Sequence, residues 1–231
     1  MSDPRVLGVD ACRTGWFGVA LLGGRASVFY ASGIADLVVG VERDGGLLDV
    51  VAVDIPIGLP DAGRRQADVL AREVAGPRWA SVFITPVRTA LEAGDYRGAA
   101  EANQRLAGEG ISRQAFALRP KLLQVDAWVR HGGRRVVEVH PEVSFATLAG
   151  RHLTTRKSSW AGAEERRRLL ADAGIVLSGD LGEAGAKAGV DDVLDAAIAA
   201  WTACRVARGE ARTLPDPPQT FSDGIPCAIR A

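Results

Sequence analysis

Two short apolar runs of the sequence each end on a carboxylate, and this pattern is typical of a shared site. The first run is Val6–Asp10 and the second is Val50–Asp54. Runs of this length that are rich in β-branched residues predict buried strands, and open α/β sheets bind their ligands at the carboxyl ends of their strands. Because Asp also caps turns and helices at such positions, neither Asp10 nor Asp54 alone decides between a structural and a functional role.

Three further carboxylates are candidates for the same site. Glu138 lies inside the apolar run Val136–His140, where an unpaired charge costs free energy, so a functional role is favoured. Asp192 and Asp195 are three residues apart at the start of a predicted helix, and therefore lie on one face of it. Asp192 also complements the helix dipole in the first turn. Asp195 lies deeper, and the small alanines after it allow the helix to approach the sheet.

These carboxylates indicate a site for a divalent cation. Mg²⁺ and Mn²⁺ prefer oxygen ligands, and close carboxylates tolerate one another when a cation lies between them. One or two such ions activate a water and stabilise the leaving oxygen of a phosphodiester. We expect Mg²⁺ or Mn²⁺ as cofactor, with Asp10, Asp54, Glu138 and Asp195 as its ligands. The candidate catalytic residues are Asp10, Asp54, Glu138, Asp192 and Asp195.

A phosphate-containing substrate requires positive charge near these acids. Arg is suited to bidentate contact with phosphate, and Lys acts as a point charge. Most single arginines are equally compatible with an exposed surface position. The candidate substrate-binding residues are Arg13, Arg113, Lys121 and Lys157. For His140, a structural role as the N-cap of a following helix is favoured over proton transfer.

Composition bounds the class of protein. The chain has 231 residues, of which 47% are hydrophobic, and 28 basic residues balance 28 acidic ones. Zero net charge excludes a general attraction to nucleic acid, so such binding requires a local patch. The three cysteines have no disulfide or zinc spacing, and we expect a reducing, cytoplasmic location. No apolar run is long enough to span a bilayer, and the polar N-terminus does not resemble a signal peptide.

The hydrophobic pattern predicts a mixed α/β sheet with helices on its faces. The expected strands are Val6–Asp10, Trp16–Leu22, Ala26–Ala31, Val50–Ile55, Val136–His140 and Ile225–Ile229. The expected helices are Ile34–Val41, Arg64–Ala75, Tyr96–Gly108, Gln114–His131 with an interruption at Pro120, Trp160–Ala173 and Val190–Arg208. Residues 61–130 form a helical insertion over the sheet edge, and the Gly-rich stretch 178–189 forms a loop.

The order of an Asp on the first strand, an acid in mid-chain and a late helical Asp resembles the ribonuclease H-like nuclease superfamily. More closely, the chain resembles the domain-of-unknown-function family 429, described as predicted nucleases of that fold. The resembling stretches are Gly8–Cys12 with Gly15–Trp16, Val53–Gly58, Ser112–Gln114, Arg119–Lys121 with Val125–Asp126, Glu138–Glu142 and Asp192–Ala196. Gln124 departs from the pattern, which has Glu there.

The resemblance implies one ribonuclease H-like domain over residues 1–231, with Asp10, Asp54, Glu138 and Asp192 or Asp195 as its acidic site residues. The expected function is a metal-dependent nuclease that acts on nucleic acid and not at a membrane. One alternative is a phosphotransferase or ATPase of the actin and sugar-kinase type, which also begins with a strand ending in Asp and a Gly-containing hairpin. A second alternative is a catalytically inactive module that binds nucleic acid or protein.

Overall fold

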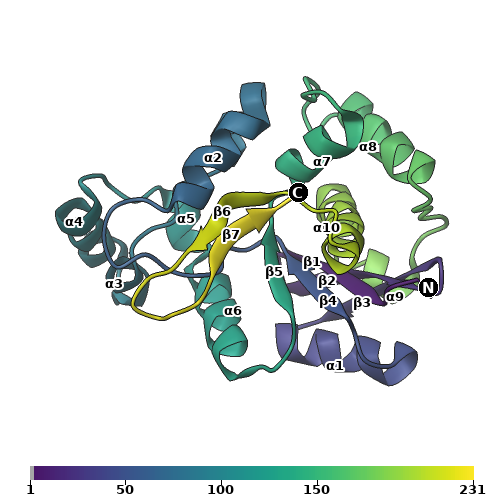
Figure 1. The fold of residues 1–231 in the computed structure, drawn as a ribbon, viewed down its shortest axis with the longest axis horizontal. Coiled ribbons are helices and arrows are strands. Elements are labelled where there is room, and N and C mark those ends of the chain that lie inside the picture. The colour runs from purple at the N-terminus through teal and green to yellow at the C-terminus, as the bar shows by residue number, and fades with distance from the viewer. Residues whose placement is uncertain (1–2) are drawn as a thin grey trace.

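The apolar runs form strands of one seven-stranded mixed sheet (Figure 1). The computed structural model describes residues 3–231. The strands are β1 (Val6–Cys12), β2 (Gly15–Leu22), β3 (Arg25–Ala31), β4 (Val50–Val53), β5 (Val136–Val139), β6 (Thr213–Gln219) and β7 (Cys227–Arg230).

The strands lie in the order β3-β2-β1-β4-β5-β7-β6 across the sheet. The first three strands pair antiparallel as a meander. From β1 the sheet continues through β4, β5 and β7 in parallel, and β6 pairs antiparallel with β7 at the far edge. The β1–β4 ladder ends at the pair Val9–Val53. Asp10, inside β1, and Asp54, directly after β4, therefore lie one residue beyond the end of this parallel ladder, at the same edge of the sheet.

Helices cover both faces of the sheet and form the segment that joins β4 to β5. They are α1 (Ile34–Gly45), α2 (Gln66–Ala75), the 3₁₀ helix η1 (Gly76–Ser81), α3 (Arg88–Glu92), α4 (Tyr96–Ala107), α5 (Arg113–Ala117), α6 (Arg119–His131), α7 (Pro141–Ala149), α8 (Trp160–Asp172), α9 (Gly182–Gly185) and α10 (Val190–Arg208). The expected helical insertion at 61–130 contains α2 to α6. No helix among residues 3–231 is long and apolar enough to cross a membrane.

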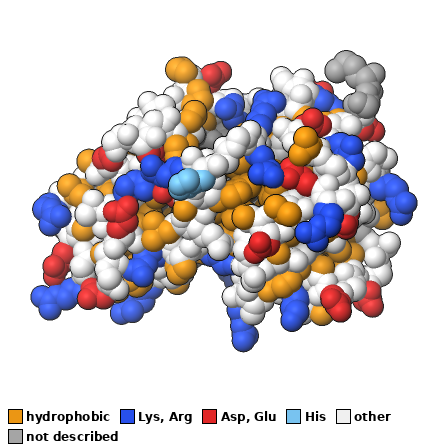
Figure 2. Space-filling view, turned by 90° about the horizontal axis from the view of Figure 1, so that it is seen from below, with side chains coloured by type: hydrophobic (Ala, Val, Ile, Leu, Met, Phe, Trp, Pro, Cys, Tyr) orange, Lys and Arg blue, Asp and Glu red, His pale blue; other side chains and the backbone are white. Residues whose placement is uncertain are grey.

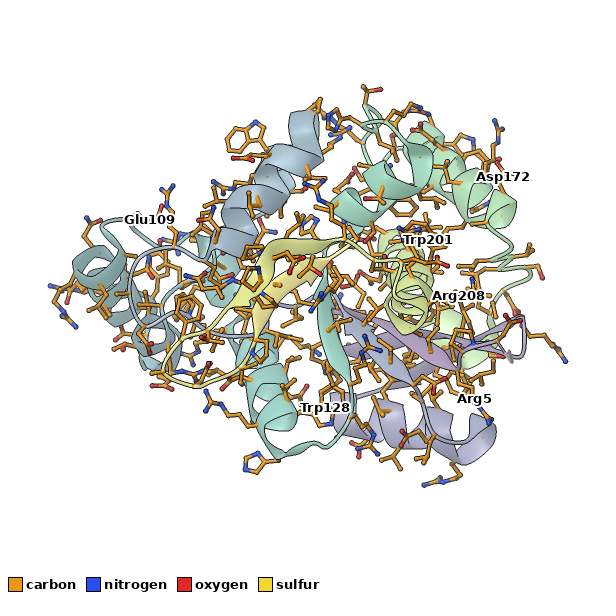
Figure 3. All side chains as sticks on the ribbon, viewed as in Figure 1. Arg5, Glu109, Trp128, Asp172, Trp201 and Arg208 are labelled. Atoms are coloured by element: carbon orange, nitrogen blue, oxygen red, sulfur yellow. The ribbon has the colours of Figure 1, made fainter. Side chains whose placement is uncertain are left out.

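Alternate residues of β1 belong to apolar cores on the two faces of the sheet. On one face, Leu7 and Val9 of β1 pack with residues of α1 and α6. On the other face, Val6 packs with residues of α10. Trp128 of α6 and Trp201 of α10 accordingly lie on opposite sides of the sheet (Figure 3).

Helix α10 lies unusually close to β1 because both elements present small groups where they meet. Gly8 of β1 faces the backbone of α10, and a Cβ at Gly8 would overlap the carbonyl oxygen of Ala196 and the amide nitrogen of Ala200. The residues of α10 at this contact, Ala196, Ala199 and Ala200, are fully buried. The absence of larger side chains thus sets the separation between helix and sheet.

The structure differs from the predicted elements in several places, and η1 and α3 are among the elements that were not predicted. The interruption in 114–131 falls at Leu118, between α5 and α6, and Pro120 lies in the first turn of α6, where its missing N–H costs nothing. The stretch 178–189 contains the short helix α9. Strand β6 was not predicted, because three of its seven residues are proline; prolines are tolerated at a sheet edge, where one side of the strand needs no ladder partner.

Replacing Gly8 with Ala tests this close contact. Because the added methyl group meets backbone that cannot rotate away, we expect Gly8→Ala to lower the free energy of unfolding by about 2 kcal/mol or more, as measured by denaturant titration. Gly40→Ala in α1 is the control, because nothing lies within 4 Å of a Cβ at that position. The control should stabilise the protein by about 0.5–1 kcal/mol. Equal effects of the two substitutions would contradict the proposed packing.

Candidate metal centre

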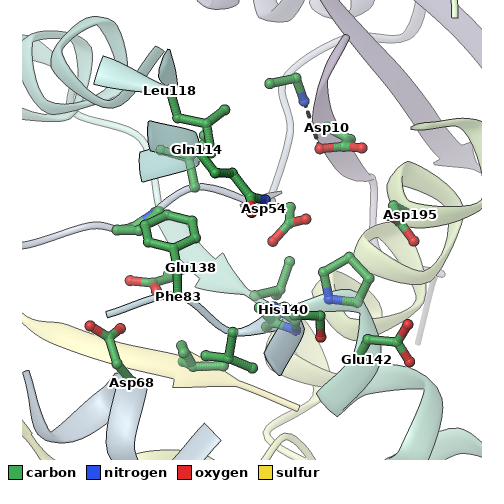
Figure 4. Close-up of a pocket in the computed structure, with 18 of the residues that line it drawn as sticks. Asp10, Asp54, Asp68, Phe83, Gln114, Leu118, Glu138, His140, Glu142 and Asp195 are labelled. Carbon is green, nitrogen blue, oxygen red and sulfur yellow. Dashed lines mark hydrogen bonds between the residues drawn. The ribbon is translucent and has the colours of Figure 1, made fainter. Parts of the chain in front are cut away.

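Three carboxylates from distant parts of the sequence, two buried and one half-buried, meet at the carboxyl edge of the sheet (Figure 4). Asp10, Asp54 and Asp195 each offer one oxygen, and these three oxygens lie within 4.8 Å of one another. We refer to these residues as the acidic triad. Three of the four predicted metal ligands therefore converge, and the group could hold a metal ion.

Strand alternation and helix packing explain this convergence. Asp10 is two residues beyond Gly8 and Asp54 is two beyond Ala52, so both side chains take the face that α10 covers. The amide of Asp54 donates a hydrogen bond to the carbonyl oxygen of Val9 at 3.0 Å, which continues the pairing of the two strands by one residue. Asp195 lies in the second turn of α10, next to the contact at Gly8.

The triad is electrostatically strained without a cation. Asp10 is 8% exposed and Asp195 only 1%. Burial raises the pKa of Asp10 well above its ordinary value, and repulsion from Asp54 and Asp195 raises it further. Burial and the charge of Asp195 likewise raise the pKa of Asp54. A divalent cation would relieve this repulsion, and three carboxylate oxygens are donors that such an ion accepts, so the residues fit a hard metal ion.

Lys157 is the predicted substrate-binding residue that lies at the triad. Its ammonium Nζ donates a hydrogen bond to Asp195 Oδ2 at 2.6 Å and lies 3.9 Å from Asp191 Oδ2. Burial lowers the pKa of Lys157, but the surrounding carboxylates, Asp195 first, raise it above its ordinary value overall. Burial raises the pKa of Asp195 to about 6, although the charge of Lys157 opposes that shift.

The other three predicted substrate-binding residues have different surroundings. Lys121 donates to the carbonyl oxygen of Gly15 at 2.6 Å, and its Nζ lies 4.5 Å from the centre of the Trp16 ring. The guanidinium of Arg113 stacks on Tyr96, and Arg13 is exposed. None of these three lines the cavity at the triad, whereas Lys157 does.

Glu138 lies outside the triad, contrary to the expectation that it is a fourth metal ligand. It pairs in register with Val53, and so points to the face opposite Asp54. Both of its oxygens accept hydrogen bonds from the fully buried Arg65, at 2.5 and 3.0 Å, and Oε2 also accepts one from the amide of Ile57 at 2.7 Å. Asp68 completes the cluster through Arg65 at 2.8 Å. Hydrogen bonds from within the protein therefore occupy both carboxylate oxygens of Glu138.

Asp192 also has a local partner. Its Oδ2 accepts a hydrogen bond from the amide of Gly189, the N-cap of α10, at 2.8 Å. Asp192 thus lies in the first turn of α10, where the sequence predicts that its charge complements the helix dipole. Burial raises the pKa of Asp192, and its charge contributes to the raised pKa of Asp10. Asp192 therefore borders the triad without belonging to it.

Two arginines neutralise carboxylates beside the triad, and sequence reasoning did not assign either arginine to its carboxylate. Arg65 holds Glu138, and Arg166 of α8 holds both oxygens of Glu142 at 2.8 and 2.9 Å. Both arginines are at most 1% exposed. Glu138 and Glu142 are distant from these arginines in the sequence, and the residues next to Arg65 and Arg166 are themselves charged or polar. No local pattern therefore indicates that either arginine is buried.

A cavity of about 150 Å³ opens beside the triad. Its wall includes the apolar side chains of Phe83 and Leu118 (Figure 4). His140 also lines the cavity. Burial lowers the pKa of His140 to about 4, and its Nδ1 has no hydrogen-bond partner among residues 3–231. His140 occupies the predicted N-cap position of α7, but its side chain makes no capping bond.

The fold and site together define a mixed α/β protein with a buried acidic centre at the carboxyl edge of its sheet. The chain belongs to the family described as protein of unknown function DUF429, whose model matches residues 8–220. This match confirms the family resemblance found in the sequence. No curated protein and no solved structure matches the chain.

The raised pKa of Asp10 predicts how stability depends on pH without metal. When folding raises the pKa of a carboxyl group, the free energy of unfolding falls as the pH rises from the ordinary pKa to the raised one, because the folded state holds the proton more tightly. Asp10→Asn in a chelator should therefore increase the free energy of unfolding at about pH 8, by about 1 kcal/mol or more. The increase should disappear near pH 4. Destabilisation at both pH values would contradict the account.

Glu138→Gln separates a structural carboxylate from a metal ligand. Removing one charge of a buried ion pair typically costs about 3–5 kcal/mol, and we expect a loss of that order in denaturant titration. The affinity for Mn²⁺, measured by calorimetry below the unfolding transition, should change little. Loss of Mn²⁺ binding with unchanged stability would instead make Glu138 a ligand.

Proposed function

We propose that the protein is a divalent-metal-dependent nuclease that hydrolyses phosphodiester bonds at the acidic triad. The observation that carries this proposal is the convergence of Asp10, Asp54 and Asp195, with Lys157 beside them. Three carboxylates this close, of which Asp10 and Asp195 are buried and Asp54 is half-buried, have no stabilising role of their own, because their mutual repulsion opposes folding. Mg²⁺ or Mn²⁺ is the proposed cofactor, since both ions prefer oxygen ligands.

The residues at the cavity have different roles in the proposed reaction. When bound, a divalent ion supplies a Lewis acid that activates water and neutralises phosphate charge. Asp10, Asp54 and Asp195 hold the ion at the edge of the cavity. Lys157 is positioned to offer positive charge to a phosphate oxygen, and Phe83 and Leu118 offer apolar surface to the sugar or base.

The topology of the sheet supports the proposal that the fold is ribonuclease H-like. An antiparallel meander, β1 to β3, leads through a helix into the parallel strands β4 and β5. Asp10 and Asp54 lie one residue beyond the end of the central parallel ladder. This arrangement agrees with the fold that the family resemblance implies.

Nucleic acid is the proposed substrate, recognised by local contacts. The chain has zero net charge, and acidic and basic side chains alternate over the face seen in Figure 2. Recognition therefore relies on charge inside the cavity rather than on a broad basic surface. A cytoplasmic location is proposed with it, supported by the free thiols of Cys12, Cys204 and Cys227.

The test is cleavage of fluorescent DNA and RNA oligonucleotides, single-stranded and duplex, in the presence of Mn²⁺. We expect Asp54→Asn to lower kcat/KM by more than about 100-fold, the scale of losing one preorganised electrostatic contact. Asp44→Asn is the control, because Asp44 is an exposed carboxylate on α1. The Asp44→Asn variant should retain full activity, and addition of a chelator should abolish that activity.

Cleavage that survives Asp10→Asn combined with Asp54→Asn would exclude the triad as the active site. Saturable binding of ATP with no cleavage of any oligonucleotide would instead support the phosphotransferase or ATPase alternative. Binding of nucleic acid without metal or cleavage would support the inactive module.

A further inference from the structure

Two of the five tryptophans are exposed, and both lie on segments that lead to the cavity. Trp79 of η1 is 54% exposed, and Trp160, the first residue of α8, is 86% exposed. By contrast, Trp16 is buried in the core, and Trp128 and Trp201 pack partly buried against the cores of the two sheet faces. Because tryptophan is highly buried on average, the two exposed indole rings point to a contact outside the chain.

The segments that carry the exposed tryptophans adjoin each other and both reach the cavity. We refer to them together as the rim, which consists of residues 74–84 and 150–163. Nη2 of Arg78 donates a hydrogen bond to the carbonyl oxygen of Thr154 at 2.5 Å, and a Cβ on Gly76 would overlap the ring of His152. Each segment also contributes to the wall of the cavity, through Phe83 and through Lys157. The rim thus runs from exposed surface to the acidic triad.

The rim carries positive charge and no carboxylate of its own. Its cationic side chains are those of Arg78, Arg151, Arg156 and Lys157. Two of the four have acidic partners outside the rim: Arg151 pairs with Glu165 at 2.6 Å, and Lys157 faces Asp195 and Asp191. Arg78 donates to a carbonyl oxygen instead, and Arg156 is exposed, and neither pairs with a carboxylate among residues 3–231. The charge of these two arginines is therefore available to a ligand.

The acids that border the rim in the sequence do not cancel this charge. Glu73 precedes the first segment, but the neighbouring Arg72 places its guanidinium 5.5 Å from the centre of the Trp79 ring. Glu164 follows the second segment and accepts hydrogen bonds from two arginines of α8, at 3.3 and 3.0 Å. Although the net charge of the chain is zero, the charge along the rim is positive.

Exposed aromatic rings beside cations are suited to single-stranded nucleic acid. Cations contact the phosphates, and aromatic rings stack on bases that are not already stacked within a duplex. The site itself also favours a flexible strand. The cavity measures about 150 Å³, and Asp10 and Asp195 are buried. A phosphate must therefore enter the cavity to reach the triad, which the outer surface of a rigid duplex does not allow.

We infer that the rim binds single-stranded nucleic acid and directs the strand to the triad. Trp79 and Trp160 stack on unpaired bases. Arg78 and Arg156 contact the phosphates of the strand. The inference rests on the proposed function for the reaction at the triad, and it deepens that function by naming single strands rather than duplexes as the substrate class. Binding to the rim requires no metal ion, so it can be measured apart from cleavage.

The experiment measures the binding of a fluorescent oligothymidylate to the full chain in a chelator, by anisotropy at several salt concentrations. Trp79→Ala should weaken binding about five-fold or more, the low end of the effect of losing one stacked base, and leave the salt dependence unchanged. Arg156→Gln should reduce the slope of log affinity against log salt by about 0.7, the change expected for one phosphate contact of a single strand. Trp79→Phe should retain most of the binding, because a phenyl ring still stacks.

Leu47→Ala and Arg43→Gln are the matched controls, because both residues are exposed and neither lines the cavity. Both controls should bind as the wild type does. Trp160→Ala should weaken binding as Trp79→Ala does, and the exposed position of Trp160 separates this effect from a loss of folding. The same strand paired with oligoadenylate should bind at least about ten-fold more weakly, because its base faces are covered.

Equal or tighter binding of the duplex, or unchanged affinity in both tryptophan variants, would overturn the inference and leave cleavage at the triad as a separate question. Equal affinity for polyglutamate would also overturn it, because charge alone would then explain binding. If the variants weaken binding as expected but no strand is cleaved in Mn²⁺, the rim stands as a binding surface and the proposed nuclease function fails.

Discussion

The contact between Gly8 and the backbone of α10 sets the distance between the helix and the sheet, and the acidic centre depends on that distance. Asp10 is two residues after Gly8, and Asp195 precedes Ala196, whose carbonyl oxygen faces Gly8. A larger residue at either position would move Asp195 away from the strands. One small-residue contact in the core thus determines whether carboxylates from opposite ends of the chain can share an ion.

The glutamates next to the triad are neutralised by the protein itself, whereas the carboxylates of the triad are not. Buried charges are tolerated only when they are paired, and Arg65 and Arg166 pair with Glu138 and Glu142 on two sides of the cavity. The carboxylates of the triad lack such arginines, and only Lys157 approaches them. The protein therefore separates carboxylates that support the fold from those whose charge remains available to a cation.

The sequence predicted the sheet, most helices and three converging acids because these follow from local patterns. Apolar runs define strands without knowledge of their partners, and alternation places Asp10 and Asp54 on one side of each strand. The position of Glu138 could not be predicted in this way. Its face depends on the register of β5 against β4, and its partner Arg65 is 73 residues away in the sequence. Strand β6 could not be predicted either, because its prolines are compatible with a strand only at the edge of a sheet. That edge position depends on the tertiary structure.

The central claim is that Asp10, Asp54 and Asp195 together bind a divalent metal ion. The most direct test is a crystal structure of the protein grown with Mn²⁺, with anomalous diffraction used to locate the ion. The account predicts an anomalous peak within coordination distance of a carboxylate oxygen from each of the three residues. A peak beside Glu138 and Arg65, or no peak at the triad at saturating Mn²⁺, would contradict it.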